Sequence, residues 1–213
     1  MARTETTEAV LVTGVYGSGK SSVIAEMAYL LRGQSYAAID LDWLAWHDTG
    51  DRRPGQEEAA EERQPGGNDP TDGGRTDPDL WLKEYEDDHE ANVPMLVANL
   101  RAIVGNYLDA GVRLFLLAGT MRSESHLERV RGAIPMPLRV VRLTLPYPEI
   151  ERRIRSDVTT ERKDDLAVSA AWIESGRDAA IGDVTVSNEG PIEEVAGEVL
   201  AWLGWPNAGY EAG

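Results

Sequence analysis

The sequence predicts an α/β fold in which helices cover both faces of a parallel sheet. An apolar run at residues 9–13 leads through a glycine cluster into a helical pattern at 20–32, and a second apolar run follows at 36–40. Strand, helix and strand in this order form a βαβ unit, whose two strands are parallel. The same alternation continues to residue 203, which predicts a single domain over residues 1–213 with five strands.

The first βαβ unit rests on two local patterns. The run at 9–13, Ala-Val-Leu-Val-Thr, is short and rich in β-branched residues, which is typical of a buried strand. The next segment is predicted to be helical because its apolar residues recur every three or four positions and Gly33 ends the pattern. These apolar residues are Val23, Ile24, Met27, Ala28 and Leu31.

Residues 48–78 interrupt the regular pattern. They are rich in Gly, Pro, Asp and Glu, so they cannot bury enough apolar surface to offset the entropy lost on ordering. We expect a mobile insertion after the second strand, which serves either as a tolerated surface loop or as a flap that orders on ligand binding.

The second half of the chain supplies the other three strands. Residues 80–110 carry a helical stripe that is expected to break near Pro94, because proline lacks the N–H that a helix interior needs. The third strand, at 113–118, has an apolar Leu-Phe-Leu-Leu centre, which indicates a central place in the sheet. The remaining strands are expected at 138–145 and 184–187, and the remaining helices at 125–132, 148–155, 166–177 and 192–203.

Composition disfavours several functional classes. The chain of 213 residues has 21 Lys and Arg against 37 Asp and Glu, a formal net charge of −16. Nucleic acids and anionic membrane surfaces need basic patches, so neither is an expected partner. The absence of cysteine excludes thiolate zinc sites and cysteine nucleophiles. No apolar run approaches the roughly 20 residues that span a bilayer, and the start lacks a signal-peptide pattern, so we expect a cytoplasmic protein.

A phosphate-binding motif follows the first predicted strand. The run Gly14-Val-Tyr-Gly-Ser-Gly-Lys-Ser21 fits G-x-x-x-x-G-K-[S/T] and opens a predicted helix. In this setting backbone N–H groups and the helix dipole hold phosphates. Lys20 is expected to reach the β- and γ-phosphates of a nucleotide, and the Ser21 hydroxyl to bind Mg²⁺. The predicted nucleotide-binding residues of the loop are Gly14, Tyr16, Gly17, Ser18, Gly19, Lys20, Ser21 and Ser22.

The acidic residues near this motif follow the second strand and not the third. The third strand ends Leu-Ala-Gly-Thr120, without the acid that motor and transport ATPases carry, and the N-K-x-D motif of regulatory GTPases is absent. The second strand ends Asp40-Leu-Asp42. Because ligands bind at the carboxyl ends of parallel strands, both carboxylates are expected to face the γ-phosphate. Alternate residues of a strand point to the same face, so both carboxylates are expected to reach the phosphates. Asp40 is closer to the sheet and is expected beside the water molecules around Mg²⁺, and Asp42 is expected further from the sheet.

These motifs resemble the P-loop small-molecule kinases, which include nucleoside monophosphate, shikimate, gluconate and adenylylsulfate kinases and chloramphenicol phosphotransferases. The resemblance spans nearly the whole chain and rests on the phosphate loop, the acidic pair and two further segments. Arg152-Arg-Ile-Arg155, followed by Arg162-Lys-Asp-Asp165, is similar to an arginine-bearing lid. Residues 183–191 are similar to the last strand and turn that border adenine.

The resemblance implies a three-layer P-loop NTPase fold with strand order 2-3-1-4-5, and ATP with Mg²⁺ as the cofactors. It also implies a lid over residues 152–165 that closes on the phosphates, and it puts Asn188 beside the nucleotide. Either acid of the pair would accept the proton of a hydroxyl group on the second substrate. The expected catalytic residues are Lys20, Asp40, Asp42, Arg155 and Arg162, with Ser21 and Asp40 as metal ligands.

The pocket for this second substrate, the acceptor, is predicted from fewer signals. Trp43 and Trp46 either wall the pocket or pack a helix onto the sheet. Arg122 binds an anionic acceptor or the γ-phosphate, or else forms a surface salt bridge. The acceptor motifs of adenylate kinases are not recognisable in the insertion, which favours a specialised small molecule. The expected substrate contacts are Asp42, Trp43, Trp46 and Arg122.

The predicted function is ATP-dependent transfer of the γ-phosphate to a hydroxyl of a small molecule, such as a metabolite, a nucleoside or an antibiotic. The alternatives are a slowly hydrolysing nucleotide switch, a nucleoside monophosphate kinase and a non-catalytic nucleotide-binding module. The acidic pair and the lid arginines argue against the switch, and intact Lys20 and Ser21 argue against the non-catalytic module. A small-molecule acceptor is the expected partner, and a homodimer stays open.

Overall fold

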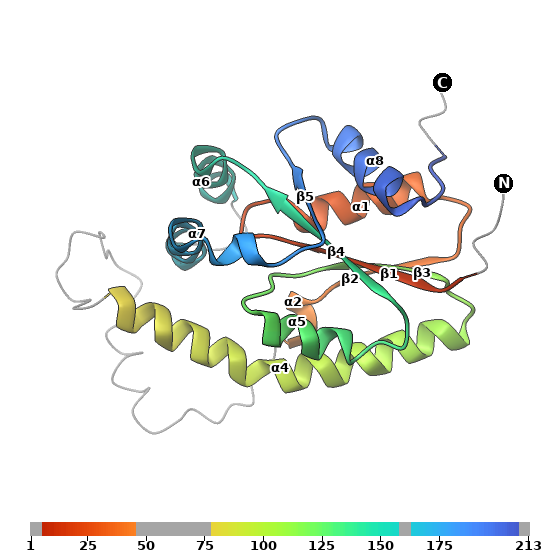
Figure 1. Ribbon diagram of the computed structural model, residues 1–213, viewed down its shortest axis with the longest axis horizontal. Helices are drawn as coiled ribbons and strands as arrows, with labels where there is room; N and C mark the ends of the chain where they lie inside the picture. Colours follow the sequence, from red (N-terminus) through yellow and green to blue (C-terminus); the bar gives the residue numbers. More distant parts are fainter. Residues whose placement is uncertain (1–5, 46–77, 158–162, 209–213) are drawn as a thin grey trace.

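A five-stranded parallel sheet forms the centre of the protein (Figure 1). The computed structural model describes residues 6–45, 78–157 and 163–208. Within them the strand order is β2-β3-β1-β4-β5, and all neighbouring strands are parallel. The five predicted strands and the order implied by the resemblance are confirmed. The strands are β1 Glu8–Thr13, β2 Tyr36–Asp40, β3 Leu114–Ala118, β4 Leu138–Thr144 and β5 Val184–Ser187.

Helices cover both faces of this sheet, as the sequence predicts. They are α1 Lys20–Leu30, α2 Asp42–Ala45, α4 Pro78–Asp109, α5 Glu124–Arg131, α6 Tyr147–Ser156, α7 Lys163–Ser175, the 3-10 helix η1 Arg177–Ala180 and α8 Ile192–Leu203. In Figure 1, α1 and α8 lie on one face and α4 and α5 on the other, while α6 and α7 stand at the left, beyond the carboxyl ends of the strands. None of the helices in the described ranges has the length and hydropathy of a membrane span.

Each face of the sheet has its own apolar core. On β1, Val10 and Val12 pack with the residues of α1 and α8, whereas Ala9 and Leu11 pack with those of α4 and α5. Every residue of β3 is buried, as a strand covered on both faces requires. The central place predicted for this strand is confirmed, and the two cores hold the carboxyl ends of β1, β2 and β3 side by side.

The expected break in the long helix is wrong. α4 continues through Pro94, and Figure 1 shows it bent along its length. Proline costs the helix one main-chain hydrogen bond. The apolar side chains of Val93, Leu96 and Leu100 are buried on either side of the bend, and this packing offsets the lost bond.

The acidic pair is placed differently from the sequence expectation. β2 ends at Asp40, and Asp42 begins the short helix α2, so the alternation of strand residues does not apply to it. The Asp42 N–H donates to Asp40 Oδ1 at 3.1 Å, a side-chain turn typical of aspartate. The two acids therefore stay adjacent through a turn and not through a strand.

Two predicted segments lie largely outside the described residues. Of the insertion at 48–78, only the last residue is described, where it begins α4. The described ends of the lid, predicted over residues 152–165, belong to α6 and α7, and residues 158–162 between them are outside the described ranges. The mobility expected of both segments stays a prediction.

Candidate functional site

The phosphate loop joins β1 to α1 at the carboxyl edge of the sheet. Gly19 is the N-cap of α1 with φ at 92°, a left-handed conformation that strains any residue with a side chain. A Cβ on Gly17, whose φ is 78°, would lie only 2.9 Å from Ile154. Glycine is therefore required by this fold at positions 17 and 19 of the loop. The loop also opens a helix, where free N–H groups attract phosphate.

Lys20 is buried against the loop that precedes it. Its Nζ donates to the Val15 carbonyl at 3.1 Å and lies 5.4 Å from the centre of the Tyr16 ring. A buried ammonium group is costly unless hydrogen bonds, ring faces or opposite charges compensate it. The carbonyl, the ring and the nearby negative charge of Asp42 do so here. Lys20 also lines the pocket beside the loop, so its charge is available to a ligand.

Ser21 and Asp40 form a pair of oxygen groups beside the loop. The Ser21 Oγ donates to Asp40 Oδ2 at 2.6 Å. In nucleotide sites Mg²⁺ takes one or two protein oxygens and completes its shell with phosphate and water oxygens. The pair fits this requirement. Among the described residues, no group of three or more His, Cys, Asp and Glu side chains could hold a metal without such help.

Asp42 lies on the wall of the same pocket. The surrounding protein limits hydration of its carboxyl, although the side chain keeps access to solvent, and this desolvation raises its pKa. The positive charges of Lys20 and Arg122 lower the pKa, and the negative charges of the neighbouring acids raise it. These acids are Asp40 and Asp165. With a pKa above the ordinary value, Asp42 is a stronger proton acceptor than a typical aspartate.

Arg122 reaches the phosphate loop from the segment after β3. Its Nη2 donates to the Tyr16 hydroxyl at 3.0 Å, and the Tyr16 ring stacks on Trp172 of α7 with 6.2 Å between ring centres. The Tyr16 side chain therefore ties the loop to two other elements. The Arg122 Nε is buried and has no hydrogen-bond partner within the described part of the chain. Such a donor is costly to leave unpaired, so it favours an anionic ligand nearby.

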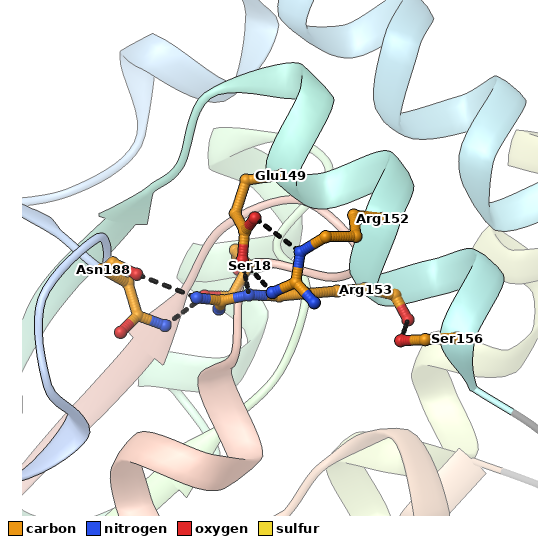
Figure 2. Close-up of polar contacts among 6 residues, drawn as sticks. All are labelled: Ser18, Glu149, Arg152, Arg153, Ser156 and Asn188. Carbon is orange, nitrogen blue, oxygen red and sulfur yellow. Dashed lines mark hydrogen bonds and ion pairs between the residues drawn. The ribbon is translucent and has the colours of Figure 1, made fainter.

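α6 brings Arg153 to the pocket, and not Arg155, which was the predicted catalytic residue. The Arg153 Nη2 donates to the main-chain carbonyl of Asn188 at 3.1 Å, and its Nε donates to Glu149 at 3.0 Å (Figure 2). Arg155 pairs with Glu151 at 2.8 Å, and its side chain is 68 % exposed. Residues two positions apart on a helix project from different sides, so only one of these arginines reaches the pocket.

A sequence signal for Arg153 did exist. Ile150 and Ile154 are the buried residues of α6, and Arg153, three positions after the first of them, lies next to their side of the helix. Hydrogen bonds from Arg152 and Arg153 lower the pKa of Glu149 to about 2. Glu149 therefore stays ionised at neutral pH and holds the Arg153 guanidinium in place.

Asn188 follows β5 and faces the phosphate loop. Its side-chain Nδ2 donates to the Ser18 carbonyl at 2.7 Å, and the residue is 2 % exposed (Figure 2). The side-chain amide is therefore already engaged with the protein at the point where the sequence analysis expected a contact with the nucleotide.

A pocket of about 610 Å³ lies between these groups. Its wall contains most of the predicted nucleotide-binding residues, including Asn188, together with Asp42. The lining also contains five residues that are not among the predicted site residues: Arg153, Ile154, Asp157, Gly190 and Ile192. The full lining is Tyr16, Gly17, Gly19, Lys20, Ser21, Ser22, Asp42, Arg153, Ile154, Asp157, Asn188, Gly190 and Ile192.

Several predicted residues are not on this wall. Trp43 is 67 % exposed, so it does not pack α2 onto the sheet, and it does not line the pocket. Ser18 is fully buried, and Gly14, Asp40 and Arg122 are likewise not part of the lining. Trp46 and Arg162 lie outside the described residues.

No profile of a known protein family and no curated protein matches the chain. The fold does match solved structures. A tunicamycin resistance protein from Deinococcus radiodurans is 14 % identical, with a TM-score of 0.57 over 96 % of this chain and 99 % of that one. A gluconokinase from Sinorhizobium meliloti is 21 % identical, with a TM-score of 0.52 over 95 % and 94 %. A shikimate kinase from Bacteroides thetaiotaomicron is 14 % identical, with a TM-score of 0.54 over 92 % and 98 %. The P-loop kinase fold that the resemblance implies is therefore confirmed over nearly the whole chain.

Proposed function

We propose that the chain is a kinase that transfers the γ-phosphate of ATP to a hydroxyl group of a small molecule. One observation carries this proposal: a carboxylate with a raised pKa, Asp42, lies in the same pocket as the phosphate loop and Lys20. The loop, the lysine and a metal ligand suffice to bind a nucleotide. An additional proton acceptor is needed when a second substrate must lose a proton.

In the proposed reaction the residues mainly position the substrates and balance charge, as phosphoryl transfer requires. The loop N–H groups and Lys20 hold the β- and γ-phosphates. Ser21 and Asp40 would hold Mg²⁺, which when bound neutralises phosphate charge. Asp42 takes the hydroxyl proton as the acceptor oxygen bonds to the γ-phosphorus and the bond from that phosphorus to the departing ADP breaks. Arg153, which also lines the pocket, adds positive charge from α6.

The unpaired Nε of Arg122 supports an acceptor that carries a carboxylate or another anionic group, because a buried guanidinium donor gains most from a charged oxygen. Arg122 is held next to the pocket by its hydrogen bond to Tyr16. Two of the solved structures that share the fold are a gluconokinase and a shikimate kinase. Gluconate and shikimate are both hydroxy acids. We propose that the acceptor is a hydroxylated small molecule that carries a negative charge.

A thermal-shift screen tests the proposal directly. Wild-type protein is combined with Mg²⁺, a non-hydrolysable ATP analogue and a panel of nucleosides, sugars, hydroxy acids and antibiotics. The analogue is expected to raise the melting temperature, and one class of acceptor to raise it further. No stabilisation by the analogue would contradict nucleotide binding. Stabilisation by the analogue with no effect of any acceptor would favour the nucleotide switch.

A further inference from the structure

We infer that Asn188 is a positioning residue whose side-chain amide turns the Gly19 N–H of the phosphate loop toward the phosphates. This inference rests on the proposed function. It assigns Asn188 to the phosphates of the nucleotide, whereas the resemblance places this turn beside the adenine base. The two assignments differ in which part of the nucleotide loses affinity when the residue is changed.

Three different elements fix the polar groups of Asn188. Its main-chain N–H donates to the Thr144 carbonyl at 2.8 Å, at the end of β4. Its main-chain carbonyl accepts the bond from Arg153 of α6 at 3.1 Å. Its side-chain Nδ2 donates to the Ser18 carbonyl at 2.7 Å (Figure 2). With the residue 2 % exposed, the amide cannot turn toward a ligand without breaking this arrangement.

The bond to Ser18 also sets the direction of the next N–H group. In a trans peptide, the C=O of one residue and the N–H of the following residue point in opposite directions. Asn188 draws the Ser18 carbonyl to itself, so the Gly19 N–H of the same peptide points away from the Asn188 amide. That N–H stands at the start of α1, where a helix leaves its donors without main-chain partners and where phosphates bind.

Gly19 and Asn188 fit each other sterically. A Cβ on Gly19 would lie 2.4 Å from Asn188 Nδ2 and 3.2 Å from Arg153 Nη1. The amide therefore occupies the space that a side chain at the loop position would need. The ionised Glu149 holds Arg153, and Arg153 holds the Asn188 carbonyl, so the support extends from α6 to the phosphate loop.

Calorimetric binding of partial ligands tests this assignment. Mg-pyrophosphate carries only the phosphates, adenosine carries only the base and sugar, and MgADP carries both. In Asn188→Ala we expect pyrophosphate and MgADP affinity to fall by about tenfold, the loss of one buried hydrogen bond, with adenosine unchanged. Asn99→Ala is the matched control, because Asn99 Nδ2 also donates to a carbonyl at 2.7 Å, that of Leu44. This control should bind pyrophosphate as the wild type does.

The variant Asn188→Asp keeps the shape of the side chain. It makes the hydrogen bond to the Ser18 carbonyl depend on protonation of the introduced carboxyl. A protonated carboxyl can donate to the Ser18 carbonyl, whereas a carboxylate repels it. Relative to the wild type at each pH, pyrophosphate affinity of this variant is expected to fall as pH rises through the pKa of the introduced carboxyl. A residue that only stabilises the fold would lower the melting temperature without this pH dependence of binding.

Each outcome decides the inference. Unchanged pyrophosphate affinity in both variants, or an equal loss of adenosine affinity, would overturn it. If Asn188→Ala does not fold, the pH dependence of Asn188→Asp carries the test alone. Wild-type protein that binds neither pyrophosphate nor MgADP would instead overturn the proposed function, and the inference with it.

Discussion

The two sides of the pocket are built differently. On the donor side, the phosphate loop is held by Asn188 and by α6, and its glycines leave no room for side chains. On the acceptor side, Asp42 begins a helix of four residues, and Trp43 beside it is 67 % exposed. The buried Asn188 and the crowded glycines thus leave the donor side little freedom. The acceptor side is more open to solvent, although the hydrogen bond from Asn99 to the Leu44 carbonyl joins α2 to α4.

This difference follows from the ligands that the two sides are proposed to bind. A nucleoside triphosphate presents the same phosphate groups to every enzyme that uses it, so one preorganised loop can serve enzymes with different acceptors. The acceptor differs from enzyme to enzyme, and function on a shared fold is decided by such variable sites. The donor side therefore carries the general chemistry, and the acceptor side the specificity.

The largest expected effect comes from the donor side. Lys20→Ala should reduce phosphate transfer to background, because the lysine lines the pocket in which the phosphates are proposed to bind. The circular dichroism spectrum should be unchanged. Lys83→Ala, at an exposed position of α4, is the matched control and should keep full activity. Near wild-type transfer by folded Lys20→Ala would contradict the role of the loop.

The next effect concerns the acceptor side. Asp42→Asn should lower kcat by about 10²- to 10⁴-fold, the usual range for a positioned base, and leave ATP affinity nearly unchanged. The wild-type rate should fall as pH falls through the raised pKa of Asp42, because only the carboxylate accepts a proton. This acid limb should disappear in the variant. An unchanged rate would mean that Asp40, or no residue of the protein, acts as the base.

Arg153 and Arg155, which project from different sides of α6, form a natural pair of variants. Arg153→Ala should raise the KM for ATP by about tenfold, because it removes a charge from the pocket and a support of Asn188. Arg155→Ala removes only an exposed ion pair with Glu151 and should change the KM by less than about twofold. Steady-state kinetics of both variants decide the matter. A larger effect of Arg155→Ala would mean that α6 presents a different face to the pocket during the reaction.

A smaller effect is expected for Asp40, which together with Ser21 is proposed to hold Mg²⁺. Asp40→Asn keeps an oxygen beside Ser21 but removes the charge that favours a divalent cation, so the Mg²⁺ concentration for half-maximal activity should rise several-fold. Saturating Mg²⁺ should restore most of the rate. A variant with an unchanged Mg²⁺ requirement would show that Asp40 does not serve the metal.

The smallest effect concerns His126, a buried residue of α5 that lies near the charge of Arg122. Burial, assisted by the charge of Arg122, lowers the pKa of His126 to about 4, while that of Glu149 is about 2. Between about pH 6.5 and 4 the unfolded chain binds a proton on His126 that the folded chain does not, so stability should fall as pH falls. We expect a loss on the order of 1–2 kcal/mol by about pH 5, measured by urea unfolding. His126→Phe should flatten this slope above about pH 5, where Glu149 is largely ionised in both the folded and the unfolded chain and so does not contribute to it.

The sequence predicted the sheet because each strand is a short apolar run, and it predicted the donor loop because its residues are contiguous. It placed Asp42 in the pocket by strand alternation, whereas a side-chain turn on Asp40 places it there. The contacts of Arg153 with Asn188, and of Asn188 with Ser18, join segments 35 and 170 residues apart. No local pattern encodes such pairings, because only the packing of α6 and β5 beside the loop creates them.

The central claim is that the γ-phosphate passes to an acceptor and not to water. The most direct measurement follows the label from ATP that is radiolabelled at the γ-phosphate, with wild-type protein, Mg²⁺ and each acceptor of the panel that stabilises the protein. We predict that the label appears in one phosphorylated acceptor, at a rate well above the release of inorganic phosphate. Label that appears only as inorganic phosphate with every acceptor would contradict the kinase and favour a nucleotide-hydrolysing switch.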